Sequence, residues 1–544
     1  MGECRGSRLA AQGDTMIQEA IYYSRMARGI REYLRTPPYS DPEAVIRRQL
    51  ENREPIFLDL VRQIIFSRPQ NPFHEMFSLA GCTFEDLTAA VRRKGLETTL
   101  ASLHRQGVYL THDEFKGKTA IVRSGRHIPA ETKSFQNPLG SGLMISTTSG
   151  SRSQGTRAPV STKVKLYREA RALLQMRELG LEGRTHIELR PILPSNTGLG
   201  ACLRGKRLGY KAERWFAVGG TMRDSAHYRG MTNLLVLTSN LLGGGVPFPT
   251  YLPHNDFAGV AAWIARCRTQ RGACVVGSFT SPAVRVAASA MENGLDISGT
   301  VFLVAGEALT DAKRAVIERA GAEVFVSYPV SEAGLVGHAC RRMKTGNRVH
   351  LFHDGLAVIS HRRKAPFSDT EVNALLLTPL LPFNPYVFIN AEMDDAGVIE
   401  PAHCDCLYSR LGFTDQVRDI FSFGKLTGQG MTLVGTDLLR ILEESLPARF
   451  GGAPGDYQLV EHEGHSQTQI TLRVSPRVRI SSTDKVRECL LAGIRSCYGG
   501  ALAARSWSHA DGLDVTIAEP FATMTGKVLP LHLLGAGGRE THVS

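Results

Sequence analysis

Residues 273–332 read ACVVGSFTSPAVRVAASAMENGLDISGTVFLVAGEALTDAKRAVIERAGAEVFVSYPVSE. Short apolar runs predict three strands, at Ala273–Phe279, Thr300–Ala305 and Glu323–Tyr328. Helical periods from Pro282 and from Asp311 predict helices between these strands, with Thr310 as the N-cap of the second helix and Gly321 at its end. Strands that alternate with helices at this spacing pair in parallel through right-handed crossovers. The stretch therefore predicts an α/β fold.

Polar residues follow the second and third of these strands. Gly306 and Glu307 come directly after the second strand, and residues 328–332, Tyr-Pro-Val-Ser-Glu, end the third. Ligands of open parallel sheets bind beyond the carboxyl ends of the strands. A structural turn does not need a carboxylate, so Glu307 and Glu332 are candidates for a binding site at this edge.

A loop rich in glycine and hydroxyl groups lies upstream, where residues 145–157 read ISTTSGSRSQGTR. It has no apolar side chain after Ile145, and Arg152 and Arg157 add positive charge. Free backbone N–H groups, hydroxyl donors and little bulk are what a loop around a polyphosphate needs. The segment is not a Walker loop, because no Gly-Lys-Ser/Thr follows at the required spacing. A plain surface loop is the alternative.

The length of 544 residues exceeds what one hydrophobic core holds, so we expect two or three domains. The segment Cys404–Gly430 is rich in Gly, Asp and Ser, which predicts a hinge. After Gly430 the pattern changes to a compact α+β module, with helices predicted at 436–446 and 483–497 and strands at 457–461, 468–474 and 513–518. The expected organisation is a helical N-terminal region at 1–120, a large domain at 121–410, the hinge at 411–429, the small domain at 430–535 and a tail at 536–544.

The charge balance favours anionic partners. The 64 lysines and arginines exceed the 52 acidic residues and leave a net charge of +12. Nucleotides, coenzyme A and acidic carrier proteins suit this charge. Nucleic acid is not expected, because the chain has no basic run and no interleaving of basic with aromatic residues.

The sequence predicts neither a membrane span nor a secretory signal. No stretch approaches 18 apolar residues, and no apolar core segment follows the arginines near the N-terminus. We therefore expect a cytoplasmic protein whose ten cysteines are reduced thiols or metal ligands.

A series of motifs stands in order along residues 140–530. These motifs are Thr148–Thr156, Ala305–Leu309, Tyr328–Glu332, Gly430–Leu438 and Thr525–Lys527. The ordered set resembles the adenylate-forming (acyl-AMP synthetase) superfamily, and most closely its phenylacetate–CoA ligase-like branch. The resemblance implies a large AMP-binding domain with mostly parallel sheets at 121–410, followed by a small mobile α+β domain.

Several departures from the superfamily pattern indicate a divergent subfamily. Arg152 and Ser153 stand where the phosphate loop prefers Thr and Gly, and Pro329 replaces a glycine. The Tyr-Arg-x-Gly-Asp motif is absent, and residues 391–397 keep only its Asp-x-Gly end. No clean Gly-Arg-x-Asp-Asp marks the hinge, where residues 423–425 read Phe-Gly-Lys. The sequence therefore leaves undecided which residues contact the ribose and which form the hinge.

The resemblance implies that a carboxylate attacks the α-phosphate of ATP and releases pyrophosphate, before the acyl group passes to a thiol of coenzyme A or of a carrier protein. Such a catalyst works through positioning, cations and hydrogen-bond donors. Glu332 would hold Mg²⁺. Lys527 would bridge the substrate carboxylate and the α-phosphate from the mobile domain. The residues implied for ATP binding are Thr148, Ser149, Gly150, Ser151, Gly306, Glu307, Tyr328, Ser331 and Asp395.

Some of these roles have structural alternatives. Tyr328 would stack on adenine, but it also suits the edge of a core. Asp395 would take the ribose hydroxyls, with neighbouring Asp394 as a rival. Glu332 could instead be an ordinary surface glutamate. Lys527 could instead be a solvated lysine near a C-terminus.

Cysteines and a histidine indicate a second metal. Cys404 and Cys406 form a short thiolate pair, and Cys340 and His350 lie upstream. Some members of the resembled branch carry a similar set that holds structural zinc, and three thiolates with one imidazole suit tetrahedral Zn²⁺. Unrelated buried cysteines are the alternative. The rivals for the nitrogen ligand are His353 and His403.

Other functions stay open beside acid–thiol ligation. One is an adenylate-forming enzyme that uses an amine, a hydroxyl group, a protein or an inorganic acid such as nitrite. Another is a nucleotide-binding homologue without activity, which the eroded region around Asp395 favours and the retained Glu332 and Lys527 oppose. The acid itself is expected to bind against Gly219–Pro249 and Ser278–Pro282.

Overall fold

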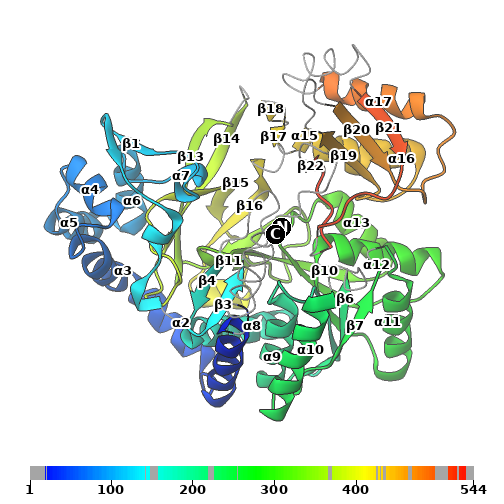
Figure 1. Cartoon of the computed structure of the whole chain (residues 1–544), viewed down its shortest axis with the longest axis horizontal. Coiled ribbons are helices and arrows are strands. Elements are labelled where there is room, and N and C mark those ends of the chain that lie inside the picture. Colours follow the sequence, from blue (N-terminus) through cyan, green and yellow to red (C-terminus); the bar gives the residue numbers. More distant parts are fainter. Residues whose placement is uncertain are drawn as a thin grey trace, which may run out of the picture.

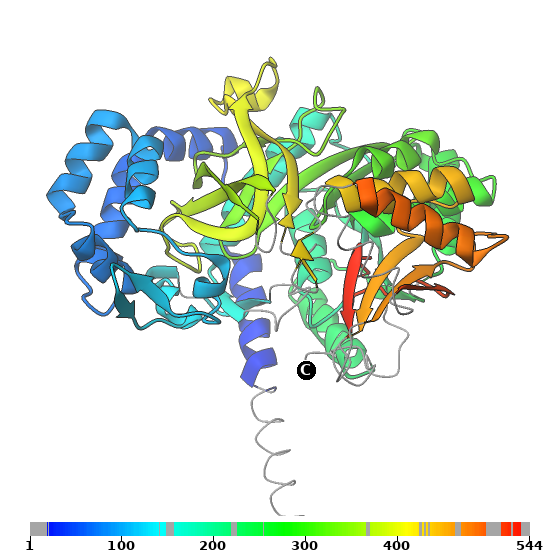
Figure 2. The same cartoon turned by 90° about the horizontal axis from the view of Figure 1, so that it is seen from above.

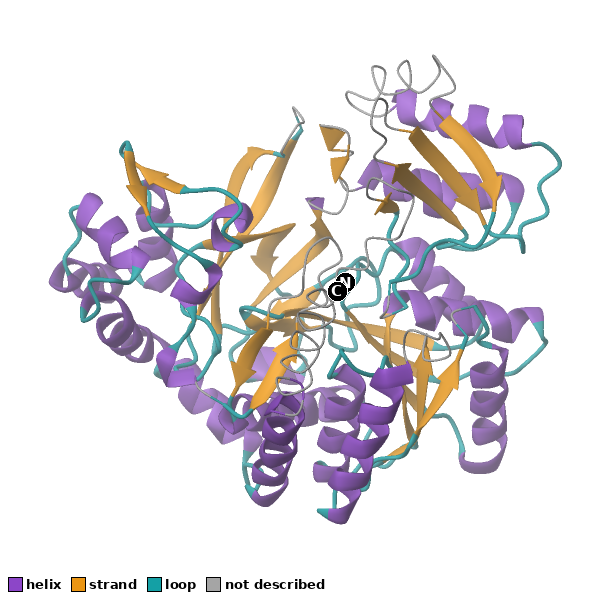
Figure 3. Ribbon diagram, in the orientation of Figure 1, coloured by secondary structure: helices purple, strands orange, loops and turns teal. Residues whose placement is uncertain are grey.

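The chain folds around one large mixed sheet, which Figures 1 and 3 show with helices around it and a smaller sheet at one end. The computed structural model describes residues 19, 21–140, 142–147, 157–218, 226–253, 255–365, 370–423, 427–428, 431–432, 436–462, 469–496, 513–523 and 526–534. Within these residues the large sheet is 12-stranded, in the order β13-β14-β15-β16-β12-β11-β10-β9-β8-β5-β6-β7.

Neighbouring strands are parallel from β7 to β10, as the alternation of strands and helices predicts. The strands of this half are β5 (His186–Leu189), β6 (Ala212–Val218), β7 (Pro249–Leu252), β8 (Val275–Phe279), β9 (Val301–Ala305) and β10 (Glu323–Val330). The helices beside them are α8 (Thr162–Leu179), α9 (Thr197–Arg207), α10 (Ala226–Leu241), α11 (Ala258–Arg271), α12 (Thr280–Glu292) and α13 (Asp311–Arg319). Thr310 is the N-cap of α13, where its hydroxyl oxygen accepts a hydrogen bond from the Lys313 amide.

The other half of the sheet is antiparallel from β10 to β13. Its strands are β11 (Gly334–His338), β12 (Val349–Leu351), β13 (Leu356–Lys364), β14 (Glu371–Pro379), β15 (Ala391–Pro401) and β16 (Asp415–Ser422), with the short helix α14 (Leu407–Arg410) before β16. Mostly parallel sheets were expected, and only the β7–β10 half is parallel. Antiparallel neighbours need no helical crossover, and residues 331–333 join β10 to β11 in a turn. Because β16 belongs to this sheet, the large domain continues into the expected hinge at 411–429.

The N-terminal helices pack against the antiparallel half and position α7 near the beginning of β15 (Figures 1 and 2). They are α2 (Pro42–Glu51), α3 (Arg53–Val61), η1 (Arg62–Phe66), α4 (Pro72–Leu79), α5 (Phe84–Lys94), α6 (Leu96–Arg105) and α7 (His112–Phe115). Leu110 accepts a backbone hydrogen bond from Glu392 of β15 at 2.9 Å. Thr111 then begins α7 with a capping box that uses Glu114. Two hairpins follow, β1 (Ile121–Arg123) with β2 (Arg126–Ile128) and β3 (Met144–Thr147) with β4 (Arg157–Val160).

The small domain has its own core. In its described part a 4-stranded sheet has the order β21-β20-β19-β22, formed by β19 (Tyr457–His462), β20 (Gln469–Val474), β21 (Leu513–Ile517) and β22 (Leu531–Leu534). The helices are α15 (Thr436–Arg440), η6 (Ile441–Ser445), α16 (Leu446–Phe450) and α17 (Thr483–Ser496), after the short hairpin β17 (Thr427–Gly428) and β18 (Met431–Thr432). The apolar cluster of this domain is separate from the main core. The sequence pattern did not indicate the β17–β18 hairpin, α16 beyond its first residue, or β22.

The small domain contacts the large domain along α12 and α13, which lie beneath it in Figure 1. Lys313 of α13 forms an ion pair with Glu443 of η6 at 2.8 Å, and the Thr310 hydroxyl donates to the same carboxylate. The backbone amide of Val528 donates to the Ser281 hydroxyl at the start of α12. These contacts bring the segment that contains Lys527 to the large sheet.

None of the helices in the described part is long and apolar enough to cross a membrane.

Candidate active site

A cavity of about 740 Å³ lies between the parallel strands and the helices α8 and α9. Its floor is one face of the sheet, because alternate residues of a strand point to the same side. These floor residues include His186 and Glu188 of β5, Val275, Gly277 and Phe279 of β8, and Leu303 and Ala305 of β9. Its roof is one face of α8, formed by residues spaced three, four or one apart: Lys165, Arg168, Ala172, Gln175 and Met176. The cavity continues to the carboxyl ends of the strands, where the sequence predicted a ligand site.

Gly277 lies on the floor of the cavity, where it has no side chain to fill the space. A Cβ atom built there would lie 2.3 Å from the Glu188 carboxylate oxygen Oε2, which is far inside contact distance. The missing side chain therefore leaves room for Glu188, which pairs with Arg190 at 2.8 Å. Arg190 in turn lies 5.7 Å from the centre of the Phe279 ring.

Glu332 lies in this cavity and forms an ion pair with Lys116. The two side chains meet at 2.7 Å, with 10% of the Glu332 side chain and 13% of the Lys116 side chain exposed. Lys116 follows α7, so the N-terminal helices supply a cation to the end of β10. Ser331 lines the cavity beside Glu332 and is exposed. The pairing removes the alternative of a freely solvated surface glutamate.

Lys527 reaches the same cavity from the small domain. It is buried, and its Nζ donates a hydrogen bond to the Gly306 carbonyl at 3.1 Å. The ammonium group also lies 4.7 Å from the centre of the Phe279 ring. Gly306 has a φ of 82°, and a Cβ there would lie 3.0 Å from Lys527 Nζ, so glycine allows the close approach. Lys527 is therefore not a solvated lysine.

The Glu307 side chain contacts the beginning of α12. Its Oε2 accepts hydrogen bonds of 2.7 Å from both the amide and the hydroxyl of Ser281, at the beginning of α12. Its backbone carbonyl accepts a hydrogen bond from the Thr280 hydroxyl at 3.1 Å. Among the described residues that line the cavity, Glu307 is absent. Its observed contacts tie the β9 turn to α12, and an ATP-binding role stays a prediction.

Tyr328 and the aspartates of β15 form a small polar group. The Tyr328 hydroxyl donates to Asp395 at 2.7 Å. Burial raises the pKa of Tyr328 well above its usual range, and the Asp395 charge adds to this effect. Asp394 has a φ of 59° and pairs with His112 of α7 at 3.1 Å. Both aspartates line the cavity, whereas the described lining does not include Tyr328.

The loop residues Thr148, Ser149, Gly150 and Ser151 lie outside the described residues. The strands on either side of the loop are described and pair with Thr147 opposite Arg157. The loop therefore connects two neighbouring strands, and its phosphate-binding role stays a prediction.

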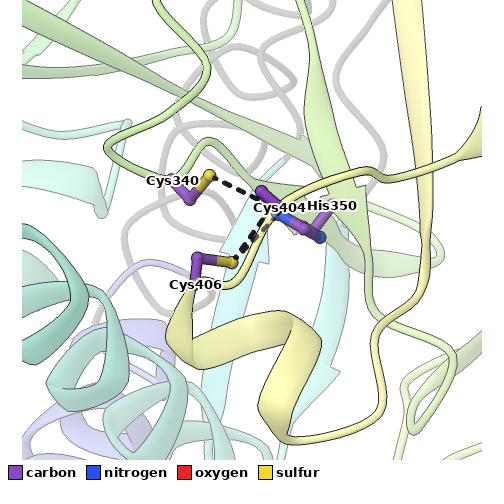
Figure 4. Close-up of side chains that lie close together, drawn as sticks. All are labelled: Cys340, His350, Cys404 and Cys406. Carbon is purple, nitrogen blue, oxygen red and sulfur yellow. Dashed lines mark hydrogen bonds between the residues drawn. The ribbon is translucent and has the colours of Figure 1, made fainter.

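The predicted zinc ligands come together. One ligand atom each from Cys340, His350, Cys404 and Cys406 lies within 4.8 Å of the others (Figure 4). His350 Nε2 is 3.2 Å from the sulfur atoms of both Cys404 and Cys406, and these sulfurs are 3.5 Å apart. The sulfur of Cys340 lies 3.9 Å from that of Cys404. His350 comes from β12 and the cysteines from the loops after β11 and β15, so the cluster links three parts of the large domain.

The two rival histidines lie elsewhere. His353 Nε2 is 2.9 Å from an Asp415 carboxylate oxygen, and His403 is exposed. The other ring nitrogen of His350, Nδ1, lies 3.1 Å from the Phe413 carbonyl oxygen. A proton on Nδ1 satisfies this contact and leaves the Nε2 lone pair directed at the sulfur atoms.

The expected acid-binding segments contribute little to the cavity. Of Ser278–Pro282, Phe279 lines it, and of Gly219–Pro249 no described residue does. The described part of the second segment includes α10, whose Leu235 and Val236 instead pack in a separate apolar cluster. The side of the cavity opposite the sheet comes instead from α8 and α9, whose inward faces the sequence pattern did not single out. Lys116 was also missed, because its only local signal was a lysine after a short helix.

The architecture is that of the adenylate-forming ligases, in which a large mixed-sheet domain precedes a small C-terminal sheet domain. Among solved structures, 2-hydroxyisobutyryl-CoA ligase in the postadenylation state superposes with a TM-score of 0.50, at 14% identity over 88% of both chains. O-succinylbenzoate coenzyme A synthetase from Bacillus subtilis, in complex with ATP and magnesium ion, gives 0.40 at 11% identity, over 82% of this chain and 86% of that chain. No protein-family model and no curated protein matches the sequence. The phenylacetate–CoA ligase-like branch stays a prediction.

Proposed function

We propose that this chain is an AMP-forming ligase, which activates a carboxylic acid with ATP, releases pyrophosphate and transfers the acyl group to a thiol. The observation that carries the proposal is the meeting of Lys527 with Gly306 in a cavity that also contains Glu332. A lysine and a carboxylate from separate domains converge at the carboxyl ends of parallel strands. This is where a ligand of such a sheet binds.

In the first half-reaction the substrate carboxylate attacks the α-phosphate, and negative charge is spread over the phosphate oxygens. Lys527 is buried and close to the reaction centre, so its charge would act in a medium of low dielectric, where stabilisation is strongest. Its place beside Phe279 would align the carboxylate with the phosphate. Thr148–Ser151 would hold the β- and γ-phosphates.

Glu332 suits a divalent metal ion because its carboxylate oxygens are at the cavity, and such ions prefer oxygen ligands. The same carboxylate forms an ion pair with Lys116. Bound Mg²⁺ would neutralise charge on the phosphate oxygens. Lys116 lies within reach of the same oxygens once Glu332 turns toward the cation. Asp395, held by the Tyr328 hydroxyl, would take the ribose hydroxyls, with Asp394 as its rival.

The second half-reaction needs room for a thiol where Lys527 now lies. Rotation of the small domain about the segment after Ser422 would withdraw Lys527 and open the cavity to the thiol of coenzyme A or of a carrier protein. An amine, a hydroxyl group, a protein or an inorganic acid such as nitrite would use the same adenylate differently. The lapsed nucleotide-binding homologue is less well supported, because Glu332 and Lys527 converge in the cavity.

We also propose that Cys340, His350, Cys404 and Cys406 hold one structural Zn²⁺. Tetrahedral coordination with Zn–S bonds of about 2.3 Å places ligand atoms roughly 3.8 Å apart. The observed separations of 3.2, 3.5 and 3.9 Å lie close to this value. The metal would fix the β15–β16 connection to β11 and β12, from which the chain continues toward the small domain.

A screen for pyrophosphate release tests the proposed function. Aromatic, fatty and amino acids are each supplied with ATP and Mg²⁺, with coenzyme A present or absent, and the nucleotide products are separated. AMP and pyrophosphate are expected with an active acid. ADP and phosphate as products would refute the mechanism, and product formation only with coenzyme A would identify the acceptor.

A further inference from the structure

Three positively charged side chains line one end of the cavity. Lys165 and Arg168 lie one turn apart on the inward face of α8, and Arg204 projects from α9. Apolar side chains line the space beyond them, among them Met176 and Leu303. The cavity therefore combines an apolar middle with a cationic end.

The carboxylates nearest to this end already have partners. Glu169 forms an ion pair with Arg207 and accepts a hydrogen bond from the Tyr33 hydroxyl, and Glu188 pairs with Arg190. In the described ranges, no carboxylate forms an ion pair with Lys165, Arg168 or Arg204. The Nε atom of Arg204 is buried and has no hydrogen-bond partner there.

The three cations repel one another in a partly buried setting. Burial lowers the pKa of Lys165 to about 8, and the charges of Arg168 and Arg204 contribute to the decrease. Burial likewise lowers the pKa of Arg168 to about 10, with contributions from Arg204 and Arg171. The Glu169 charge opposes the decrease at Lys165. Burial acts to lower the pKa of Arg204, but the Tyr210 hydroxyl and the Glu188 charge outweigh it and raise this pKa. Within the described residues, neither carboxylate forms an ion pair with the three cations, so an anion bound among them would be stabilised.

The cationic end of the cavity lies opposite the end that Lys527 reaches. Lys527 contacts Phe279 at the end of β8. Arg204 lies beside Tyr210, whose ring contacts that of His186 at the start of β5 at a tilt. His186 is in register with Val275, four residues before Phe279. At ~3.3 Å per residue, the two levels are about 13 Å apart. After a hydrogen-bond contact of about 3 Å at each end, roughly 7 Å remain for the ligand.

We propose that the acid activated by this protein carries a second anionic group, which Lys165, Arg168 and Arg204 bind at the end of the cavity opposite Lys527. This inference rests on the proposed function. The ligand class is an elongated acid with an apolar spacer. Extended adipate comes nearest to the remaining distance among the diacids tested below, and pimelate and suberate are longer members of the series. The second group is an oxyanion, either a carboxylate or a phosphonate-like group.

The test compares matched acids in the pyrophosphate-release assay. Adipate, pimelate and suberate are paired with hexanoate, heptanoate and octanoate, and 6-phosphonohexanoate distinguishes the two oxyanions. A charge-assisted contact changes binding by roughly 10- to 100-fold. The diacids are therefore expected to have a kcat/KM at least about tenfold above that of the monoacids of the same length. Equal or higher values for the monoacids at every length would overturn the inference.

Variants of the cavity residues test whether the preference for diacids depends on Lys165 and Arg168. Lys165→Met and Arg168→Gln are expected to lower the ratio of diacid to monoacid kcat/KM by about tenfold each. Lys163→Met is the matched control, because Lys163 is exposed on the same helix and should leave the ratio unchanged. An equal loss for diacid and monoacid in both cavity variants would contradict the assignment.

Direct binding separates this inference from the proposed function. Calorimetric titration of the full chain with pimelate and with heptanoate needs no ATP chemistry. If no acid releases pyrophosphate but pimelate binds more tightly, and Lys165→Met abolishes the difference, the anion site stands and the ligase proposal fails. If pyrophosphate is released with other acids while pimelate and heptanoate bind equally, the anion site fails alone.

Discussion

Replacing Glu443 with glutamine removes the carboxylate that pairs with Lys313 between the two domains. The side chains are 8% and 6% exposed for Lys313 and Glu443, and their charged atoms are 2.8 Å apart. Burial lowers the pKa of Lys313, but the charges of Glu443 and Glu307 outweigh this effect and raise it. Glu443→Gln therefore leaves a buried ammonium group with weakened compensation when the domains are docked.

Breaking a buried ion pair by removing one partner typically costs 3–5 kcal/mol. Glutamine retains an acceptor for Lys313 and the Thr310 hydroxyl, so we expect about 2–3 kcal/mol against the docked arrangement. This corresponds to roughly a 30- to 150-fold smaller docking constant. Because docking brings Lys527 to Gly306, adenylate formation should decrease, whereas thioester formation from supplied acyl-AMP should change little.

The assay measures the half-reactions separately. Exchange of labelled pyrophosphate into ATP reports adenylate formation, and thioester release from synthetic acyl-AMP reports the second step. Glu444→Gln is the control, because Glu444 is the next residue after Glu443 and its side chain is exposed. The pair Lys313→Met with Glu443→Leu should recover part of the loss, since it leaves no unpaired charge. Equal losses in both half-reactions, or none in either, would refute the role of this contact in docking.

Further changes address the proposed site directly. Lys527→Ala should slow adenylate formation by two or more orders of magnitude on the scale of lost oxyanion donors, and an equal loss in thioester formation would reject its assigned role. Glu332→Gln should raise the Mg²⁺ concentration needed for pyrophosphate release, and an unchanged Mg²⁺ dependence would count against this ligand. Cys404→Ser with Cys406→Ser should abolish zinc in elemental analysis and lower the melting temperature, and a zinc-free wild-type chain would discard the metal. Wild-type zinc should also be lost as the pH falls and protons compete for the thiolates.

The local fold could be predicted because its signals are local. The strands β8, β9 and β10 follow short apolar runs, and Thr310 caps α13 through its own hydroxyl. The antiparallel half was harder to predict, since its pairing depends on hairpin registers with bulges, such as the one between Tyr328 and Pro329. A shift in register changes which side chains face the cavity. This explains why the sequence could not place Tyr328.

The site could be predicted only in part. The clustering of Cys340, His350, Cys404 and Cys406 was predicted from the short thiolate pair and from a similar set in the resembled branch, and the structure brings the four side chains together. The ion pair between Lys116 and Glu332 joins residues 216 positions apart, and no pattern in one sequence reports such a contact. The cationic end of the cavity likewise depends on how α8 and α9 rotate against the sheet, which tertiary packing decides.

Gly277 lies on the floor midway along the cavity, between the end that Lys527 reaches and the end lined by Arg204. A methyl group there would displace Glu188, and Arg190 would then lose the carboxylate that neutralises it. In the proposed function, the acid would bind on one side of this glycine and ATP on the other. Substitutions of the α8 and α9 residues at the Arg204 end would then change which acids are accepted, while the carboxyl ends of the strands, where ATP would bind, stay unchanged. One scaffold can in this way diversify its substrates by changing a few inward-facing positions.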